Sequence, residues 1–178
     1  GGTVYGEPRY LPIDEFHPLA PLSVYGHSKK IIESYLEFFK NNSPMKIKVL
    51  RPSNIYGPGQ NPWGAQGAVA IAFRHIIERR PFRLFGKGEA MRDYLFISDL
   101  VEALSLVLLY PDSVTANIST GKGVLLSELL EMIQAVSGEI LRIEQVKARP
   151  DFVQANVLSN SHAHRELGWS PHVTIEEG

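Results

Sequence analysis

The sequence predicts an α/β fold in which short buried strands alternate with amphipathic helices. Residues 47–51 carry Ile, Val and Leu and stop at Pro52, a pattern typical of a short buried strand. Apolar residues recur at helical intervals over residues 24–39, before that strand, and again from residue 67 onward. Strands and helices that alternate in this way favour a parallel sheet covered by its connecting helices.

The first quarter of the chain contains a loop and a helix. Residues 7–21 hold four prolines together with acidic Asp14 and Glu15, and this composition predicts an irregular loop. The helix over residues 24–39 is expected to end at 41–44, where Asn, Asn, Ser and Pro follow one another. The apolar residues at helical spacing in it are Ile31, Ile32, Tyr35, Leu36, Phe38 and Phe39.

The rest of the chain repeats the alternation. A loop rich in Gly, Pro, Asn and Gln is expected over residues 56–66. Further strands are expected over residues 82–85, 94–97, 115–118 and 143–146, the last of them at a sheet edge. Further helices are expected over residues 67–78, 99–109, 126–136 and 161–167.

Local signals indicate where some of these helices begin and end. Serine is a common residue just before a helix, so we expect Ser98 to cap the helix over 99–109. Ser127 or its neighbour is expected to cap the next helix. Gly168 is expected to close the last helix, and Trp169 beside it is expected to anchor the core.

Composition argues against several classes of protein. The 18 basic and 19 acidic residues nearly balance and form no long basic run, so nucleic acid is not expected as a ligand. With no cysteine there is no disulfide or thiolate metal site, which fits a cytoplasmic protein. The six histidines show no spacing that recurs with carboxylates, so no metal site is expected. No apolar run is long enough to span a bilayer.

Tyr25 and Lys29 stand one turn apart on the predicted helix, and therefore on one face of it. A fixed ammonium beside a phenol favours the phenolate. Such a phenol can take a proton from a hydroxyl while a cofactor takes the hydride. The same spacing also occurs by chance between surface residues that do no chemistry, so the pair alone leaves both interpretations open.

Further motifs accompany this pair in a fixed order. They lie at residues 3–6 (TVYG), 50–59 (LRPSNIYGPG), 84–88 (LFGKG), 91–94 (MRDY) and 165–171 (RELGWSP). In this order and spacing the chain resembles the extended short-chain dehydrogenase/reductase family. It is most similar to the UDP-glucose 4-epimerase-like group of nucleotide-sugar epimerases and dehydratases. The resemblance covers nearly all 178 residues.

The resemblance implies the C-terminal part of a Rossmann-type parallel sheet plus a smaller α/β substrate-binding domain. Residues 1–60 would end the dinucleotide-binding domain, and 61–178 would mainly form the substrate domain, with 95–120 returning to the main sheet. The Gly-rich turn that lets backbone approach a pyrophosphate is not found, because residues 57–59 enclose a proline. We therefore expect part of a longer enzyme that binds NAD poorly on its own.

The resemblance also assigns roles around a bound NAD. Tyr25 would be the general base and acid, and Lys29 would tune it and hydrogen-bond the nicotinamide ribose. The residues expected to lie around the nicotinamide are Pro52, Ser53 and Ile55.

A second set of residues is implied in substrate binding. Asn54 would hold the sugar or its phosphate, although an asparagine there could simply form a turn. Arg92 would bind the diphosphate, since a guanidinium binds phosphate oxygens bidentately; its alternative is an ion pair with Asp93 or Glu89. Arg149 would give a second diphosphate or ribose contact, and Gln66 or nearby backbone would contact the nucleotide.

Two departures from the family pattern bear on the reaction. Many members carry Ser or Thr four residues before the Val-Tyr-Gly tyrosine, where this chain has Gly1, so Thr3 is expected to supply the catalytic hydroxyl unless a serine lies upstream. Dehydratases place an Asp-Glu pair before Val-Tyr-Gly, where this chain has Gly2 and Thr3. This difference speaks against a dehydratase and favours an epimerase. The resemblance implies a UDP-sugar as the substrate, while the motifs leave the nucleotide base and the sugar open.

The sequence leaves two other functions open. One is a dehydratase or reductase on the same scaffold, and the other is a non-catalytic domain that binds a nucleotide-sugar. The family also implies a homodimer that pairs through the tyrosine-bearing helix, and a cytoplasmic location.

Overall fold

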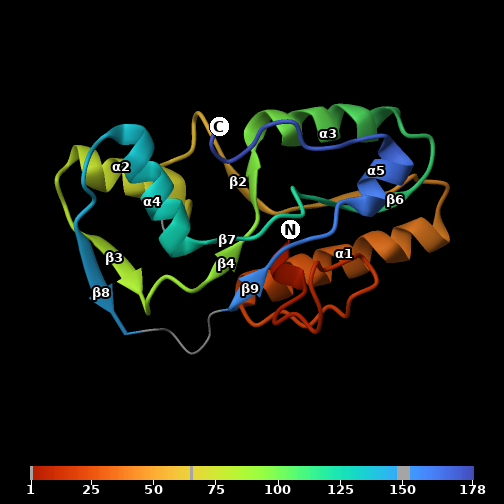
Figure 1. Cartoon of the computed structure of the whole chain (residues 1–178). Coiled ribbons are helices and arrows are strands. Elements are labelled where there is room, and N and C mark those ends of the chain that lie inside the picture. The colour runs from red at the N-terminus through yellow and green to blue at the C-terminus, as the bar shows by residue number, and fades with distance from the viewer. Residues whose placement is uncertain (1, 65, 148–152) are drawn as a thin grey trace.

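The computed structural model describes residues 2–64, 66–147 and 153–178 (Figure 1). The helices in these residues are α1 (Val24–Asn42), α2 (Ala68–Ile77), α3 (Ile97–Leu109), α4 (Leu126–Ser137) and α5 (Ser161–Leu167). The strands are β1 (Lys48–Pro52), β2 (Asn54–Tyr56), β3 (Phe82–Phe85), β4 (Met91–Arg92), β5 (Tyr94–Phe96), β6 (Val114–Ile118), β7 (Val124–Leu125), β8 (Ile143–Val146) and β9 (Ala155–Asn156). A short 3-10 turn, η1 (Gly2–Val4), precedes the loop over residues 7–21.

Parallel pairing dominates the strand arrangement, as the sequence predicts. β1 pairs with β6, β2 with β5, and β3 with β8, all in parallel. β4 joins β9 in parallel and β7 antiparallel. β8 pairs with β3 alone among the described strands, so the edge position expected for residues 143–146 is confirmed. The α/β fold class is therefore confirmed.

Two apolar cores lie on either side of the β2–β5 pair. In Figure 1, α2, α4, β3 and β8 gather at one end of the molecule, and α1, α3, α5 and β6 gather at the other. Tyr94 packs into the first core, whereas its neighbour Leu95 packs into the second. Successive side chains of a strand point to opposite faces, so β5 contributes to both cores.

Trp169 lies in the second core with only 1% of its surface exposed, which confirms it as a core anchor. Its indole Nε1 donates a hydrogen bond of 3.0 Å to the backbone oxygen of Asp99. A buried tryptophan needs such a partner for its single polar atom.

A third, smaller core fixes the start of the chain. Val4, Tyr5, Ile13 and Leu158 are all fully buried in it. Apart from a single bridge between Ile13 and Leu158, residues 7–21 contain neither helix nor strand, which confirms the irregular loop.

Two predicted caps are wrong. α3 begins at Ile97 rather than after Ser98, and no side chain caps it. α4 begins at Leu126, so Ser127 lies inside its first turn. In both cases a strand runs directly into the helix, so the last strand residue occupies the capping position. Glu128 compensates in α4, because its carboxylate accepts a hydrogen bond of 2.8 Å from the Leu125 backbone N–H.

Two other helix ends follow their local sequence signals. Ser23 caps α1 as an acceptor for the Gly26 N–H at 3.0 Å. Gly168 closes α5 with a φ of 64°, a left-handed conformation that favours glycine.

The apolar residues of α1 are largely uncovered by the described part of the chain. Only Gly26 is buried in this helix, whereas Tyr35 and Phe38 are 66% and 60% exposed. The amphipathic pattern of residues 24–39 thus forms a helix but does not supply much of the core. No helix in the described residues combines the length and apolar character needed to cross a membrane.

Candidate active site

Tyr25 and Lys29 lie together on the first turns of α1. The Lys29 ammonium lies 5.2 Å from the centroid of the Tyr25 ring, so the two side chains share one face. Tyr25 is 50% exposed, and its ring is therefore not sealed in apolar packing. The geometry leaves this phenol accessible to a ligand with a cation beside it.

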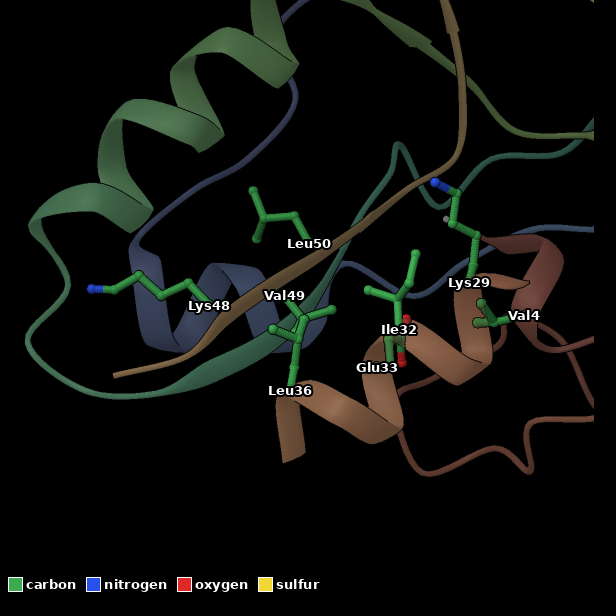
Figure 2. Close-up of a pocket in the computed structure, with 8 residues that line it drawn as sticks. All are labelled: Val4, Lys29, Ile32, Glu33, Leu36, Lys48, Val49 and Leu50. Carbon is green, nitrogen blue, oxygen red and sulfur yellow. The ribbon is translucent and has the colours of Figure 1, made fainter. Parts of the chain in front are cut away.

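Lys29 also lines a groove between α1 and β1 of about 230 Å³. Figure 2 shows Lys29, Ile32 and Leu36 projecting from α1 on the side of β1, where Val49 and Leu50 also line the groove. Lys29 therefore faces the same groove as β1, the strand whose carboxyl end carries the predicted ligand-binding residues.

Thr3 lies beside this end of α1 because Gly26 allows η1 to approach closely. A Cβ at Gly26 would lie 2.8 Å from the Thr3 backbone oxygen, closer than real Cβ contacts allow. Thr3 itself is exposed. The glycine of the Tyr-Gly pair therefore brings Thr3 next to the turn that bears Tyr25.

Ser53 joins the carboxyl end of β1 to the start of β2. The Ser53 N–H donates to Ile118 O at 2.9 Å, and Asn54 N–H donates to Asp93 O at the same distance. The Asn54 side-chain amide also donates to Asp93 O, at 3.2 Å. Pro52, Ser53, Asn54 and Ile55 are all partly exposed. They lie where open α/β sheets bind ligands, beyond the ends of their strands.

Asp93 organises this strand end, and sequence reasoning missed it. Its fully buried carboxylate accepts hydrogen bonds from the hydroxyls of Ser53 (3.0 Å) and Thr120 (2.8 Å). It also accepts the backbone N–H groups of Thr120 (3.0 Å) and Gly121 (2.9 Å). Burial raises the pKa of Asp93, and these donors oppose the rise. The available signal was a charged residue inside an apolar strand pattern.

Arg92 holds the segment that leads into β9. Its guanidinium donates to the backbone oxygens of Met91 (2.7 Å), Val153 (2.8 Å) and Gln154 (3.4 Å). Burial lowers the pKa of Arg92. The second predicted phosphate ligand, Arg149, lies outside the described residues.

Asn156 links Arg92 to the start of the chain. It is the β9 residue paired with Arg92, and its side-chain amide donates to the Gly2 backbone oxygen at 3.1 Å. Contacts therefore run from Gly26 of α1 through η1 and Asn156 to Arg92.

Gln66 and Ile55 lie on either side of the loop that follows β2. Gln66 is exposed, just before Gly67, the capping residue of α2. Ile55 lines a second hollow of about 220 Å³, with the loop at residues 57–60 and Ile97, rather than the groove of Lys29. The described residues contain no cluster of three or more His, Cys, Asp or Glu side chains able to hold a metal ion.

Tyr25 and Lys29 share one face of a helix in an α/β fold with parallel strand pairs, an arrangement compatible with the family that the sequence resembles. The family model described as GDP-mannose 4,6 dehydratase matches residues 2–178. The chain belongs to the epimerase/dehydratase group of the extended short-chain dehydrogenase/reductase family.

Known relatives and structures agree with this family. UDP-glucose 4-epimerase of Mycolicibacterium smegmatis is 33% identical over 181 residues, which cover 100% of this chain and 57% of that protein. The crystal structure of Thermotoga maritima UDP-glucose 4-epimerase with UDP-glucose has a TM-score of 0.95 and 36% identity. The crystal structure of Thermus thermophilus UDP-glucose 4-epimerase in complex with NAD has a TM-score of 0.92 and 32% identity.

The chain spans only part of each of these proteins. The matches to the Thermotoga maritima and Thermus thermophilus structures cover 100% and 99% of this chain, respectively. In each case they cover only 58% of the crystallised chain.

Proposed function

We propose that this chain is part of a longer NAD-dependent UDP-hexose 4-epimerase, here called the full-length enzyme. The observation that carries the proposal is the Lys29 ammonium 5.2 Å from the Tyr25 ring, beside a groove that reaches β1. Matches to epimerases over the whole chain, including structures with UDP-glucose and with NAD, support the choice of substrate and cofactor.

The chain's own residues would handle the proton in this reaction. NAD, when bound, supplies the acceptor and later the donor of a hydride. The phenolic oxygen of Tyr25 would accept the proton from the sugar hydroxyl during oxidation, becoming the phenol, and would return that proton during reduction. The Lys29 ammonium lies 5.2 Å from the Tyr25 ring, and the exposed Thr3 hydroxyl would hydrogen-bond the same sugar oxygen.

Lys29 also suits the nicotinamide ribose. It is partly buried and lines an open groove, so its ammonium can hydrogen-bond ribose hydroxyls. Pro52, Ser53 and Ile55 would complete the cofactor contacts from the ends of β1 and β2. Asn54, Gln66, Arg92 and Arg149 would bind the nucleotide-sugar.

Incubation of the full-length enzyme with UDP-glucose and NAD, followed by NMR of the products, tests this function. We expect UDP-galactose. The family model that matches the chain carries the description of a dehydratase. Loss of water to give a 4-keto-6-deoxy sugar would therefore favour a dehydratase over an epimerase. The present chain alone should neither turn over substrate nor bind NAD tightly. Micromolar NAD affinity for it would contradict our assignment of the phosphate-binding turn to a part of the enzyme outside this chain.

The proposal includes the two-domain division at residues 60 and 61, with residues 95–120 returning to the main sheet. The parallel pairing of β6 with β1 supports that return. It also includes a homodimer that pairs through α1, since Ile31 and Tyr35 are 56% and 66% exposed there. Sedimentation of the full-length enzyme should give twice the monomer mass, and a monomer at micromolar concentration would contradict this.

We further propose a cytoplasmic location, which cell fractionation would check. We propose no nucleic acid as a partner.

A further inference from the structure

Arg51, near the end of β1, forms the least exposed ion pair in the described part of the chain. Its Nη2 lies 2.6 Å from Glu33 Oε2, and its Nε donates to both carboxylate oxygens at 3.1 and 3.2 Å. The two side chains are only 7% and 16% exposed. This forked geometry is one that a guanidinium forms and an ammonium cannot reproduce.

The same guanidinium also holds the start of the chain. Its Nη1 donates to the Tyr5 hydroxyl at 2.7 Å, and that hydroxyl donates to Asn117 Oδ1 at 2.7 Å. Burial raises the pKa of Tyr5 to about 12, so the phenol keeps its proton for this bond at neutral pH. The backbone N–H of Asn117 in turn donates a hydrogen bond of 2.6 Å to the Glu15 carboxylate. One buried network therefore joins α1, β1, β6 and the loop over residues 7–21.

Both ends of this network lie close to the groups that we place in the reaction. Tyr25, Lys29 and Glu33 follow one another at intervals of four residues, so they lie along one face of α1. Tyr5 directly follows η1, which carries Thr3. Arg51 thus contacts Glu33 on the helix that bears Tyr25 and Lys29, and Tyr5 at the end of the turn that bears Thr3.

Apolar packing does little to fix α1 in the described residues. Gly26 alone is buried in it, and the groove between α1 and β1 remains open. A buried ion pair seldom adds net stability over well-packed apolar residues, because desolvation of the two charges offsets their attraction. The Arg51–Glu33 pair therefore acts mainly on geometry. Its fixed hydrogen bonds would be lost if α1 rotated on β1.

We propose that Arg51 and Glu33 are positioning residues, which set the rotation of α1 on β1 and so hold Tyr25 and Lys29 in register with Thr3. This inference rests on the proposed epimerase function. A displacement of about 1 Å in a reacting group can lower a rate by about 100-fold. Loss of the forked contact should therefore affect turnover more than substrate binding.

The test uses Arg51→Lys and Glu33→Gln in the full-length enzyme. Lysine keeps the charge but loses the fork, and glutamine keeps one acceptor oxygen, so a folded protein is expected from at least the second variant. We expect kcat to fall by about 10-fold to 100-fold with KM for UDP-glucose within about threefold of wild type. Lys46→Met, which breaks the exposed Lys46–Asp112 pair, is the matched control and should change neither constant.

Two readouts separate positioning from general destabilisation. On a Tyr25→Phe background, Arg51→Lys should lower the remaining activity by less than about threefold, because residues that act through one another are not additive. Hydrogen exchange of the amides over residues 25–33 should speed up in both variants and stay unchanged in Lys46→Met.

The outcomes distinguish the inference from the function on which it rests. Wild-type kcat and unchanged exchange in both variants would overturn the positioning role while leaving the epimerase intact. Equal losses with and without Tyr25 would also overturn it. No turnover of any UDP-sugar by the wild-type enzyme would instead contradict the proposed function, and the exchange measurement would still decide whether the pair holds α1.

Discussion

Replacing Tyr25 with phenylalanine should lower kcat of the full-length enzyme by about 100-fold to 10,000-fold, the usual contribution of a general acid–base group. The change removes one oxygen atom from a half-exposed side chain, so folding should be little affected. KM for UDP-glucose should stay within a few fold, because our proposal assigns substrate binding mainly to other residues. Steady-state kinetics with a coupled UDP-galactose assay would measure both constants.

Tyr35→Phe provides the matched control for this experiment. Tyr35 lies on the same helix and is 66% exposed. The same loss of a phenolic oxygen there should leave kcat unchanged. If Tyr25→Phe kept more than about a third of wild-type kcat, Tyr25 would not be the proton-transfer group, and a binding domain would become the better interpretation.

Asp93→Ala should lower the free energy of unfolding by about 3 to 5 kcal/mol, since each buried donor left without an acceptor costs about 1 to 3 kcal/mol. The carboxylate accepts four hydrogen bonds that join the end of β1 to the turn after β6. Asp93→Asn keeps one acceptor oxygen and should fall between alanine and wild type. Urea denaturation followed by circular dichroism would measure the three proteins.

Asp112→Ala is the control for Asp93. Asp112 pairs with Lys46 on the surface, where its side chain is 66% exposed, so its removal should cost no more than about 1 kcal/mol. A loss for Asp93→Ala as small as that of the control would mean that water replaces the missing acceptor. The account of Asp93 as the group that holds Ser53 and the Thr120 turn would then be wrong.

Local signals account for the parts of the fold that sequence reasoning predicted. Strand β3 and helix α5 begin and end where expected, because glycine and the apolar pattern mark their limits within a few residues. The two wrong caps, Ser98 and Ser127, follow strands whose direct entry into a helix depends on pairing with distant residues. The two-residue strands β4, β7 and β9 have no periodicity, so no sequence pattern could have predicted them.

The candidate site divides in the same way. The Tyr25–Lys29 pair needs only helical spacing, and the structure places the two side chains together on α1. Arg51 and Glu33 are 18 residues apart, and Asp93 lies 40 residues from Ser53, so only the tertiary fold brings these partners together. The roles of Gln66 and Ile55 were assigned by resemblance alone and stay predictions.

The central claim is that Tyr25 transfers the proton of the sugar hydroxyl, while the hydride passes from the sugar to bound NAD and back without leaving the site. The most direct test is to give the full-length enzyme UDP-glucose labelled with deuterium at C4 of the sugar and to follow the label by NMR. A hydride taken from C4 and returned to the same carbon predicts UDP-galactose that keeps its deuterium in ordinary water. Galactose formed with hydrogen from the solvent at C4 would contradict the account.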